Sequence, residues 1–210
     1  MVSGNLMQNF TIKNMENNAL FKRKYILGSA SPRRKELLKG LDIDFIVDTN
    51  NNFIEEYPNN IELESIPEYL ACGKSKGFHR DLKDNETLIT ADTMVLCKGE
   101  IMGKPKNYSD AKRMLEKLSD STHSVITGVC IRDINLCKSF SVTTEVTFNN
   151  LSSNEIDYYI SNYNPMDKAG AYAVQEWIGH IGISKINGSY FNVVGLPVQK
   201  LYSELKNIYK

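Results

Sequence analysis

Short apolar segments alternate along this chain with segments whose apolar residues recur at helical spacing. The first apolar segment, residues 25–27, has the length of a strand and runs through a turn of small residues into a helical pattern with three leucines on one face. Ser31 suits the N-cap of this helix and Pro32 its first position, where the missing N–H of proline costs nothing. These residues predict a strand, a tight turn and a helix.

The same alternation continues to the end of the chain. Ser65 and Glu68 have the spacing of a capping box, as do Ser152 and Glu155, which predicts the starts of two further helices. The apolar and β-branched segment 88–96 predicts a buried strand. The other expected elements are strands at 45–47, 123–131 and 139–148, helices at 110–118 and from 197 onward, and a hairpin of 181–186 with 190–194. This order predicts an α/β or α+β domain with a mixed sheet.

The composition is that of an ordinary globular protein, with 210 residues, 41% hydrophobic and 24% charged. This length can bury a core and suits one domain or two intimately packed lobes. The 25 basic and 25 acidic residues cancel, so nucleic acid and anionic membranes are not attracted overall, and any anion site is local. The four cysteines lack C-x-x-C spacing and the three histidines lie far apart, which argues against a zinc site or a disulfide framework.

Residues 1–23 are expected to be a leader, either disordered or added for expression, before a domain at 24–210. The leader is rich in Asn and Met but lacks the apolar stretch and cleavage site of a signal peptide. No apolar run in the sequence approaches the length of a membrane span. We therefore expect a cytoplasmic protein, whose natural start could equally be Met15.

Two arginines, Arg33 and Arg34, fall in the first turn of the first predicted helix. The helix dipole is positive at this end, so each arginine costs roughly a few tenths of a kcal/mol unless an anion lies nearby. A phosphate there would accept hydrogen bonds from the helix amides, from Ser29 or Ser31, and from the guanidinium groups. The alternative is a solvated helix start whose arginines only extend into water.

A single carboxylate, Asp92, interrupts the apolar segment 88–96. A buried carboxylate needs a cation or a hydrogen-bonding partner, since burial alone raises its pKa. Beside a phosphate site its role would be ligand of Mg²⁺ or general base for a water molecule. The alternative is an Asp that caps a turn by bonding to the Thr93 amide. Other charged candidates, each weak alone, are the cations Lys74 and Lys104 and the carboxylates Glu55 and Glu56.

Two segments nearer the C-terminus, 167–175 and 188–197, are rich in glycine and small residues. Glycine in such segments permits close approach of a ligand to the backbone, or it simply serves turns. Gln175 offers both a donor and an acceptor, which recognition of a pyrimidine edge requires.

Taken together and in this order, these pieces resemble the Maf family of nucleotide pyrophosphatases over residues 25–202. The resemblance implies a Maf/inosine triphosphatase-like α/β fold, with an elongated, bent mixed sheet, flanking helices and a cleft between two lobes, often in a homodimer. It also implies hydrolysis of a nucleoside triphosphate between its α and β phosphates with a divalent metal cation, Mg²⁺ or Mn²⁺. The matching motifs are S-x-S-P-R-R at 29–34, A-D-T at 91–93, G-K-P at 103–105, H-S-V-I-T-G at 123–128, T-E-V at 144–146, D-K-A-G-A-Y at 167–172 and G-L-P at 195–197.

The resemblance implies roles for individual residues as well. Asp92 matches the family's proton acceptor, and Arg33 and Lys104 match phosphate-binding positions. Lys74 matches a lysine on the helix after the acidic loop. Three residues match positions that separate subfamilies and are typical of the branch that acts on dTTP and UTP: Arg34, Thr93 and Gln175.

The acidic loop departs from the family's usual D-I-D-E, because it reads Phe-Ile-Glu-Glu at 53–56. The expected metal ligands are therefore Asp92 together with Glu55 or Glu56. Pyrimidine nucleotides modified at the 5 position are further candidate substrates. Two other functions stay open: a nucleotide-sensing regulator of cell division without turnover, and a purine-analogue triphosphatase of the ITP type.

Overall fold

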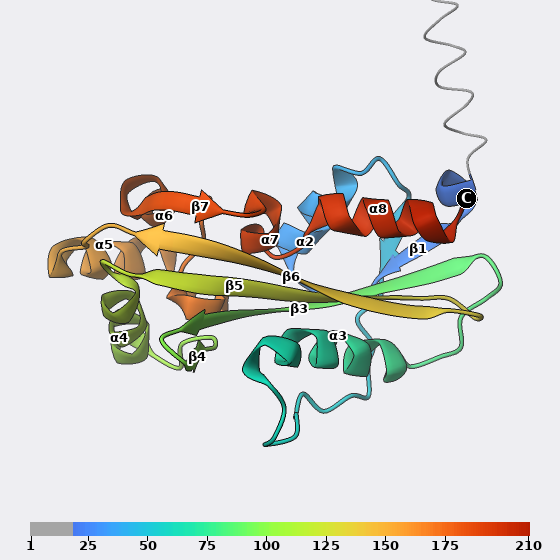
Figure 1. The fold of residues 1–210 in the computed structure, drawn as a ribbon, viewed down its shortest axis with the longest axis horizontal. Helices are drawn as coiled ribbons and strands as arrows, with labels where there is room; N and C mark the ends of the chain where they lie inside the picture. The colour runs from blue at the N-terminus through green and yellow to red at the C-terminus, as the bar shows by residue number, and fades with distance from the viewer. Residues whose placement is uncertain (1–18) are drawn as a thin grey trace, which may run out of the picture.

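A seven-stranded mixed sheet forms the centre of the computed structural model, which describes residues 19–210 (Figure 1). The strands lie in the order β2-β1-β3-β5-β6-β7, and β4 pairs with β3. The pairs β2–β1 and β1–β3 are parallel, whereas β3, β5, β6 and β7 pair antiparallel. The strands are β1 (Lys24–Leu27), β2 (Phe45–Val47), β3 (Glu86–Cys97), β4 (Glu100–Met102), β5 (Thr122–Arg132), β6 (Cys137–Phe148) and β7 (Ile183–Asn187).

Helices flank this sheet on both faces. In Figure 1, α3 lies on one face, while α2 and α8 lie together on the other, and α4 and α5 lie at the far end. The long strands β3, β5 and β6 run along most of the molecule, which confirms the elongated, bent sheet of a mixed α/β fold. The helices are α2 (Pro32–Lys39), α3 (Ile66–Lys76), α4 (Tyr108–Leu118), α5 (Ser153–Tyr163), α6 (Trp177–Gly182), α7 (Tyr190–Val194) and α8 (Val198–Ile208), with 3-10 turns η1 (Ala19–Lys22), η2 (Leu63–Ser65), η3 (Pro165–Asp167) and η4 (Ala169–Ala171).

The two largest hydrophobic cores among residues 19–210 lie along this one sheet and form its two lobes. The first core packs under α4 and α5 and includes Val95 of β3. The second packs under α2 and α8 and includes Ala91 of the same strand. β3 is 12 residues long, so it passes from one core into the other. Asp92 lies on β3 between these two contributions, at the boundary of the lobes.

Helix α3 lies close to the sheet beside Asp92. Gly128 of β5 pairs with Asp92 in the sheet register, and a Cβ at Gly128 would overlap the backbone of Glu68 on α3. Only glycine therefore lets the start of this helix pack so near the strand. The buried hydroxyl of Thr90 also donates to the Ala71 carbonyl at 2.7 Å, which fixes α3 against β3.

The expected capping box at the start of α3 is wrong. The Ser65 side chain makes no capping hydrogen bond. Glu68 instead accepts from the hydroxyls of Ser139 at 2.7 Å and Ser141 at 3.0 Å, both on β6. The close packing of α3 on the sheet thus supplies Glu68 with tertiary partners that replace the local cap.

The expected hairpin of 181–186 with 190–194 is also wrong. Residues 190–194 form α7, a short helix with Ser189 as its N-cap. Strand β7 pairs with β6 instead, so the Asn-Gly turn joins a strand to a helix. The second predicted capping box, between Ser152 and Glu155, is confirmed at the start of α5.

Residues 19–23, assigned to the leader from sequence, belong to the folded part. Ala19–Lys22 form η1, and Leu20 is fully buried in the core under α2 and α8. The Tyr25 hydroxyl donates to the Leu20 carbonyl at 2.9 Å. The rest of the expected leader, 1–18, lies outside the described residues. Between 19 and 210, no helix combines the length and the apolar character needed to span a bilayer.

A buried histidine, His123 on β5, connects the core to the cleft described below. It is 2% exposed, and its Nε2 lies 2.8 Å from the hydroxyl of Tyr172. Its Nδ1 has no hydrogen-bond partner among the described residues. Burial lowers the pKa of His123 from 6.5 to about 4, because the charged ring would lose its hydration without gaining a counterion.

This burial predicts a pH dependence of stability. The unfolded chain binds a proton at His123 as the pH falls below about 6.5, whereas the folded protein resists it down to about 4. The stability contribution is therefore complete above the unfolded pKa and is lost as the pH falls. Urea denaturation at pH about 7.5 and about 5 measures this loss of unfolding free energy. We expect the decrease over this interval to be about 2 kcal/mol larger for the wild type than for His123→Gln. Parallel pH profiles for the two proteins would contradict the assignment.

Candidate active site

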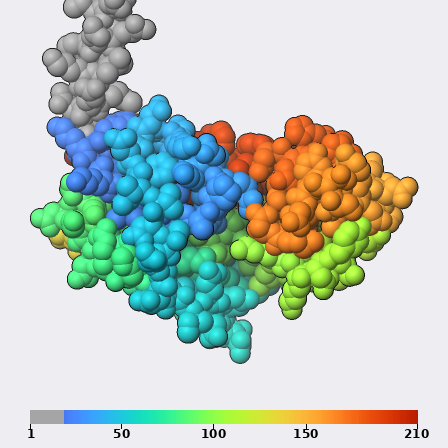
Figure 2. All heavy atoms as spheres, turned by 180° about the vertical axis from the view of Figure 1, so that it is seen from behind, coloured from blue at the N-terminus to red at the C-terminus, as the bar shows by residue number. Residues whose placement is uncertain are grey.

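A cleft of about 860 Å³ lies between the two lobes, a volume typical of small-molecule sites. Figure 2 shows it as the hollow between the blue segment around α2 and the orange segment around η3 and η4. The lining comes from the turn after β1, the acidic loop, α3, the middle of β3, the loop after β4, the segment 167–175 and the turn before α8. Residues far apart in sequence are thus brought together at one place.

Almost every site residue expected from sequence lines this cleft. Glu56 is the exception, because it is absent from the lining. Of the acidic pair, Glu55 is the residue that lines the cleft. The expected residues that line the cleft are Ser29, Arg33, Arg34, Glu55, Lys74, Asp92, Thr93, Lys104 and Gln175.

The partner of Asp92 is Lys74. Their charged groups lie 2.6 Å apart, and each side chain is 18% exposed. The same ammonium lies 3.2 Å from the carboxylate of Glu55. Asp92 lies within β3 and is paired with β5, so the turn-capping alternative is wrong. Lys74 reaches this position because α3 packs so closely beside the strand.

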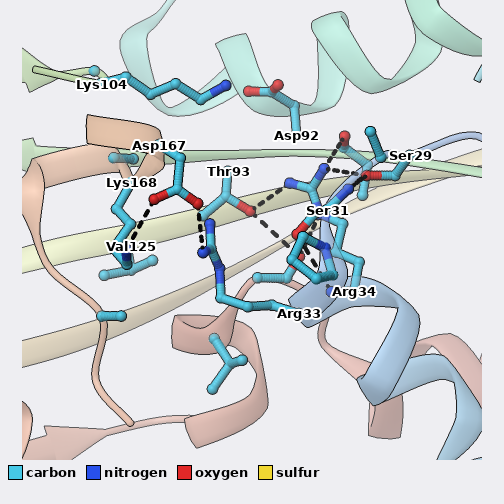
Figure 3. A pocket seen from close by; sticks show the side chains of 18 of the residues that line it. Ser29, Ser31, Arg33, Arg34, Asp92, Thr93, Lys104, Val125, Asp167 and Lys168 are labelled. Carbon is cyan, nitrogen blue, oxygen red and sulfur yellow. Dashed lines mark hydrogen bonds and ion pairs between the residues drawn. The ribbon is translucent and has the colours of Figure 1, made fainter. Parts of the chain in front are cut away.

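The guanidinium of Arg34 is committed to protein acceptors (Figure 3). It donates to the carbonyls of Gly195 at 2.8 Å and Ala91 at 2.9 Å. It also donates to the hydroxyls of Thr93 at 2.9 Å and Ser29 at 3.2 Å. Burial lowers the pKa of Arg34, while the charge of Asp92 acts in the opposite direction. These hydrogen bonds differ from the direct phosphate contact expected for Arg34. They hold the turn after β1 against β3.

Arg33 reaches across the cleft to the other lobe. Its guanidinium lies 3.0 Å from the carboxylate of Asp167, and these side chains are 24% and 58% exposed. Burial acts to raise the pKa of Asp167, but hydrogen bonds from Lys168 and Arg33 outweigh it and lower the pKa to about 2. The accessible Arg33, unlike Arg34, can exchange its partner for a ligand anion.

Asp167 and Lys168 were not identified as site residues from sequence. The buried Lys168 ammonium lies 2.9 Å from Asp167 and 3.4 Å from Glu176, and both residues of the Asp-Lys pair line the cleft. The adjacent opposite charges of Asp167 and Lys168 are the signal in the sequence that points to this pair. Lys168 is therefore a fifth cationic side chain in the lining, beside Arg33, Arg34, Lys74 and Lys104.

Lys104 and Gln175 line the cleft without polar contacts of their own. In Figure 3 the Lys104 ammonium points toward the Asp92 carboxylate, and it forms no ion pair with any residue between 19 and 210. Gln175 is exposed, so its amide is available to a ligand. Apolar lining accompanies Gln175 in the same cleft, from Val125, Tyr172, Ala173, Val193 and Val194. A ligand with both a charged and a flat apolar part fits such a lining.

Asp92 and Glu55, two carboxylates of the cleft lining, are the residues that could hold a metal ion. Among the described residues, no group of three or more His, Cys, Asp or Glu side chains is arranged to hold a metal. Mg²⁺ is commonly bound through one or two carboxylates, with phosphate oxygens and water completing the shell. The residues present therefore fit a cation that enters together with a polyphosphate, rather than one held by protein ligands alone.

Comparison with known proteins shows the family of this chain. The family described as "Maf-like protein" matches residues 24–208. The "dTTP/UTP pyrophosphatase" of Phocaeicola vulgatus is 56% identical, over 90% of this chain and 98% of its own. That of Parabacteroides distasonis is 51% identical, over 90% and 97%. A solved structure of a HAM1 protein from Coxiella burnetii aligns with TM-score 0.44 and 14% identity, covering 88% of this chain and 99% of that one. The chain belongs to the Maf-like protein family.

Proposed function

We propose that this protein hydrolyses dTTP and UTP between the α and β phosphates, releasing the nucleoside monophosphate and pyrophosphate. The observation that carries the proposal is Asp92, a largely buried carboxylate held against Lys74 in a cleft lined by further cations. The two relatives compared above carry the name dTTP/UTP pyrophosphatase. Such an activity removes nucleotides from the pool and so has a housecleaning role.

The triphosphate binds between Arg33 and Lys104 in this proposal. Arg33 exchanges Asp167 for phosphate oxygens, and Lys104, which has no ion pair within 19–210, contributes its charge directly. Charge-assisted hydrogen bonds of this kind are the strong ones, and guanidinium groups bind phosphate bidentately. Lys74 adds a third cation as it is released from Glu55 and Asp92.

Asp92 then orients the attacking water and accepts its proton. A general base of this kind has to lie within hydrogen-bonding reach of the water, and Asp92 lines the cleft beside the cations that bind phosphate. Asp92 and Glu55 would also hold Mg²⁺ or Mn²⁺, which when bound neutralises polyphosphate charge. Arg34 holds Ser29, Ala91 and Thr93 in place around the reacting group.

Gln175 recognises the base. Its amide can donate to a uracil or thymine carbonyl and accept from the ring N–H. Ala173, a small residue in the same lining, leaves room for a methyl or another group at the 5 position. The homodimer that the family resemblance implies stays a prediction, as does the cytoplasmic location expected from the lack of a signal peptide and a membrane span in the sequence.

A substrate panel assayed by pyrophosphate release tests the proposal. We expect dTTP and UTP to be hydrolysed well, dATP, GTP, ITP and 7-methyl-GTP poorly, and no release in excess chelator. Discrimination between dTTP and UTP should be modest, because one methyl group is worth only about 1–3 kcal/mol in a pocket. Gln175→Ala should reduce the selectivity for pyrimidine over purine nucleotides more than it reduces the affinity for the triphosphate. Absence of turnover would favour a sensing role, and ITP as the best substrate would favour the purine-analogue function.

Asp92→Asn is expected to lower turnover at least about 100-fold while the fold and nucleotide binding persist, since removal of a general base has this effect. Stopped-time pyrophosphate assays and nucleotide titrations measure the two quantities. Asp44→Asn is the control, because Asp44 is exposed and lies outside the cleft lining. Near wild-type turnover of Asp92→Asn would remove Asp92 from the mechanism.

Arg33→Ala and Lys104→Ala are each expected to weaken binding of dTTP much more than binding of thymidine, because each removes a cation that contacts phosphate. Lys106→Ala is the matched control, since Lys106 is exposed and lies outside the lining. Calorimetric titration of both ligands gives the comparison. If both cleft variants bind dTTP as tightly as the control does, the triphosphate binds elsewhere.

A further inference from the structure

A chain of hydrogen bonds runs from the cleft into the core beneath α7. The Arg34 guanidinium donates to the Thr93 hydroxyl at 2.9 Å (Figure 3). Thr93 and Thr127 pair directly across β3 and β5, and their hydroxyl oxygens lie 2.9 Å apart. The Thr127 hydroxyl lies 3.2 Å from the backbone carbonyl oxygen of Asn192 on α7. Thr127 and Asn192 are fully buried and absent from the cleft lining, so neither touches a ligand there.

The donors and acceptors of this chain follow one direction. A hydroxyl group has a single proton to donate, and the Asn192 carbonyl can only accept, so the Thr127 proton is used there. Thr127 therefore accepts from Thr93, and Thr93 accepts from Arg34, whose guanidinium can only donate. The chain thus leads from the guanidinium to a helix carbonyl, and its middle member is the Thr127 hydroxyl.

Helix α7 depends on tertiary hydrogen bonds for its position, because five residues are too few to form a stable helix alone. The Asn192 side-chain amide donates to the Val125 carbonyl of β5 and to the Thr144 hydroxyl of β6, each at 3.0 Å. The bond from Thr127 holds the backbone of Asn192 as well. The next two residues, both valines at 193–194, belong to the apolar lining of the cleft. The position of this apolar wall is therefore set from β5 and β6.

We propose that Thr127 is a positioning residue for the apolar wall of the cleft, and through it for the base of the nucleotide. The inference rests on the proposed function, since it takes Val193 and Val194 as the surface against which the pyrimidine packs. Thr127 acts only through the Asn192 carbonyl, which keeps the end of α7 against β5. A purine is larger than a pyrimidine, so a wall released from this bond admits it more readily.

The phosphate end of the cleft keeps its own hydrogen bonds when the Thr127 hydroxyl is removed. Arg34 still donates to the backbone carbonyls of Ala91 and Gly195. Thr93 still accepts from Arg34 and has a second acceptor in the Gly195 carbonyl, at 3.4 Å. Loss of the Thr127 hydroxyl should therefore affect binding of the base and spare binding of phosphate.

Calorimetric titration of thymidine and of inorganic pyrophosphate separates these two effects. Valine has the branched shape of threonine without the hydroxyl, and serine keeps the hydroxyl. We expect Thr127→Val to weaken thymidine binding about five- to tenfold, the size of one hydrogen bond, and to change pyrophosphate binding less than about twofold. Thr127→Ser should bind both as wild type does. A thermal melt establishes that each variant is folded, and Thr127→Ala replaces Thr127→Val if valine prevents folding.

Thr87→Val is the matched control. Thr87 is as fully buried as Thr127 and lies on β3, but it is absent from the cleft lining. Its hydroxyl bonds to Arg23 and Tyr209 instead. Loss of a buried hydroxyl in this variant should leave binding of thymidine and of pyrophosphate unchanged.

Turnover assays give a second measurement. In Thr127→Val, the KM for dTTP should rise by the same factor as the thymidine dissociation constant, while kcat changes little, because Asp92 is untouched. The preference for dTTP over dATP in kcat/KM should fall. Thr127→Ser should restore all three quantities.

The two ligands also separate failure of this inference from failure of the proposed function. Thymidine binding that is absent from wild type, or unchanged in Thr127→Val, would overturn the inference. Equal weakening of thymidine and pyrophosphate would do the same, as would a serine variant that behaves like the valine one. The expected binding pattern in a protein that hydrolyses no dTTP would support the inference and contradict only the proposed function.

Discussion

The hydrogen bonds of the half-buried Arg34 guanidinium are the interaction on which the geometry of the cleft depends. Burying a charge is costly unless its donors are satisfied, and Arg34 meets that requirement with acceptors from three separate segments. They are the turn after β1 at Ser29, the strand β3 at Ala91 and Thr93, and the turn before α8 at Gly195. Gly195 has φ +128°, a conformation that glycine adopts without strain and that completes the end of α7. The Arg34 side chain thus joins three segments that line the cleft around Asp92.

Apart from Lys104, which forms no ion pair within residues 19–210, the remaining cations of the cleft are compensated by carboxylates of the protein. Lys74 is balanced by Asp92 and Glu55, Arg33 by Asp167, and Lys168 by Asp167 and Glu176. A polyphosphate can therefore enter by exchanging partners with carboxylates, without requiring a strongly basic surface. This explains how a chain with equal numbers of acidic and basic residues can hold a local site for a highly charged anion.

Local chemistry made much of this predictable from sequence. Ser31 does cap α2 with Pro32 at its first position, and an Asp in an apolar strand did require a cation, which is Lys74. What sequence could not give was strand register and helix packing. Those tertiary contacts gave Glu68 hydrogen bonds from Ser139 and Ser141 in place of its expected cap.

The expected phosphate role of Arg34 shows the same limit. Its place in the first turn of α2 is compatible with binding an external anion or with bonding to the protein, and only the fold distinguishes them. Asp167 and Lys168 are likewise recognisable as cleft residues only from the fold, which places Asp167 against Arg33 of α2 and against Lys168. The sequence therefore predicts which residues line the cleft more fully than it predicts the contacts that each of them makes.

The most direct test of the account is the position of the bond that breaks and the phosphorus that water attacks. Hydrolysis of dTTP in water enriched in oxygen-18, followed by mass spectrometry of the products, measures both at once. The account predicts thymidine monophosphate carrying one labelled oxygen together with unlabelled pyrophosphate. Label in the pyrophosphate, or release of thymidine diphosphate with inorganic phosphate, would contradict attack at the α-phosphorus by a water that Asp92 orients.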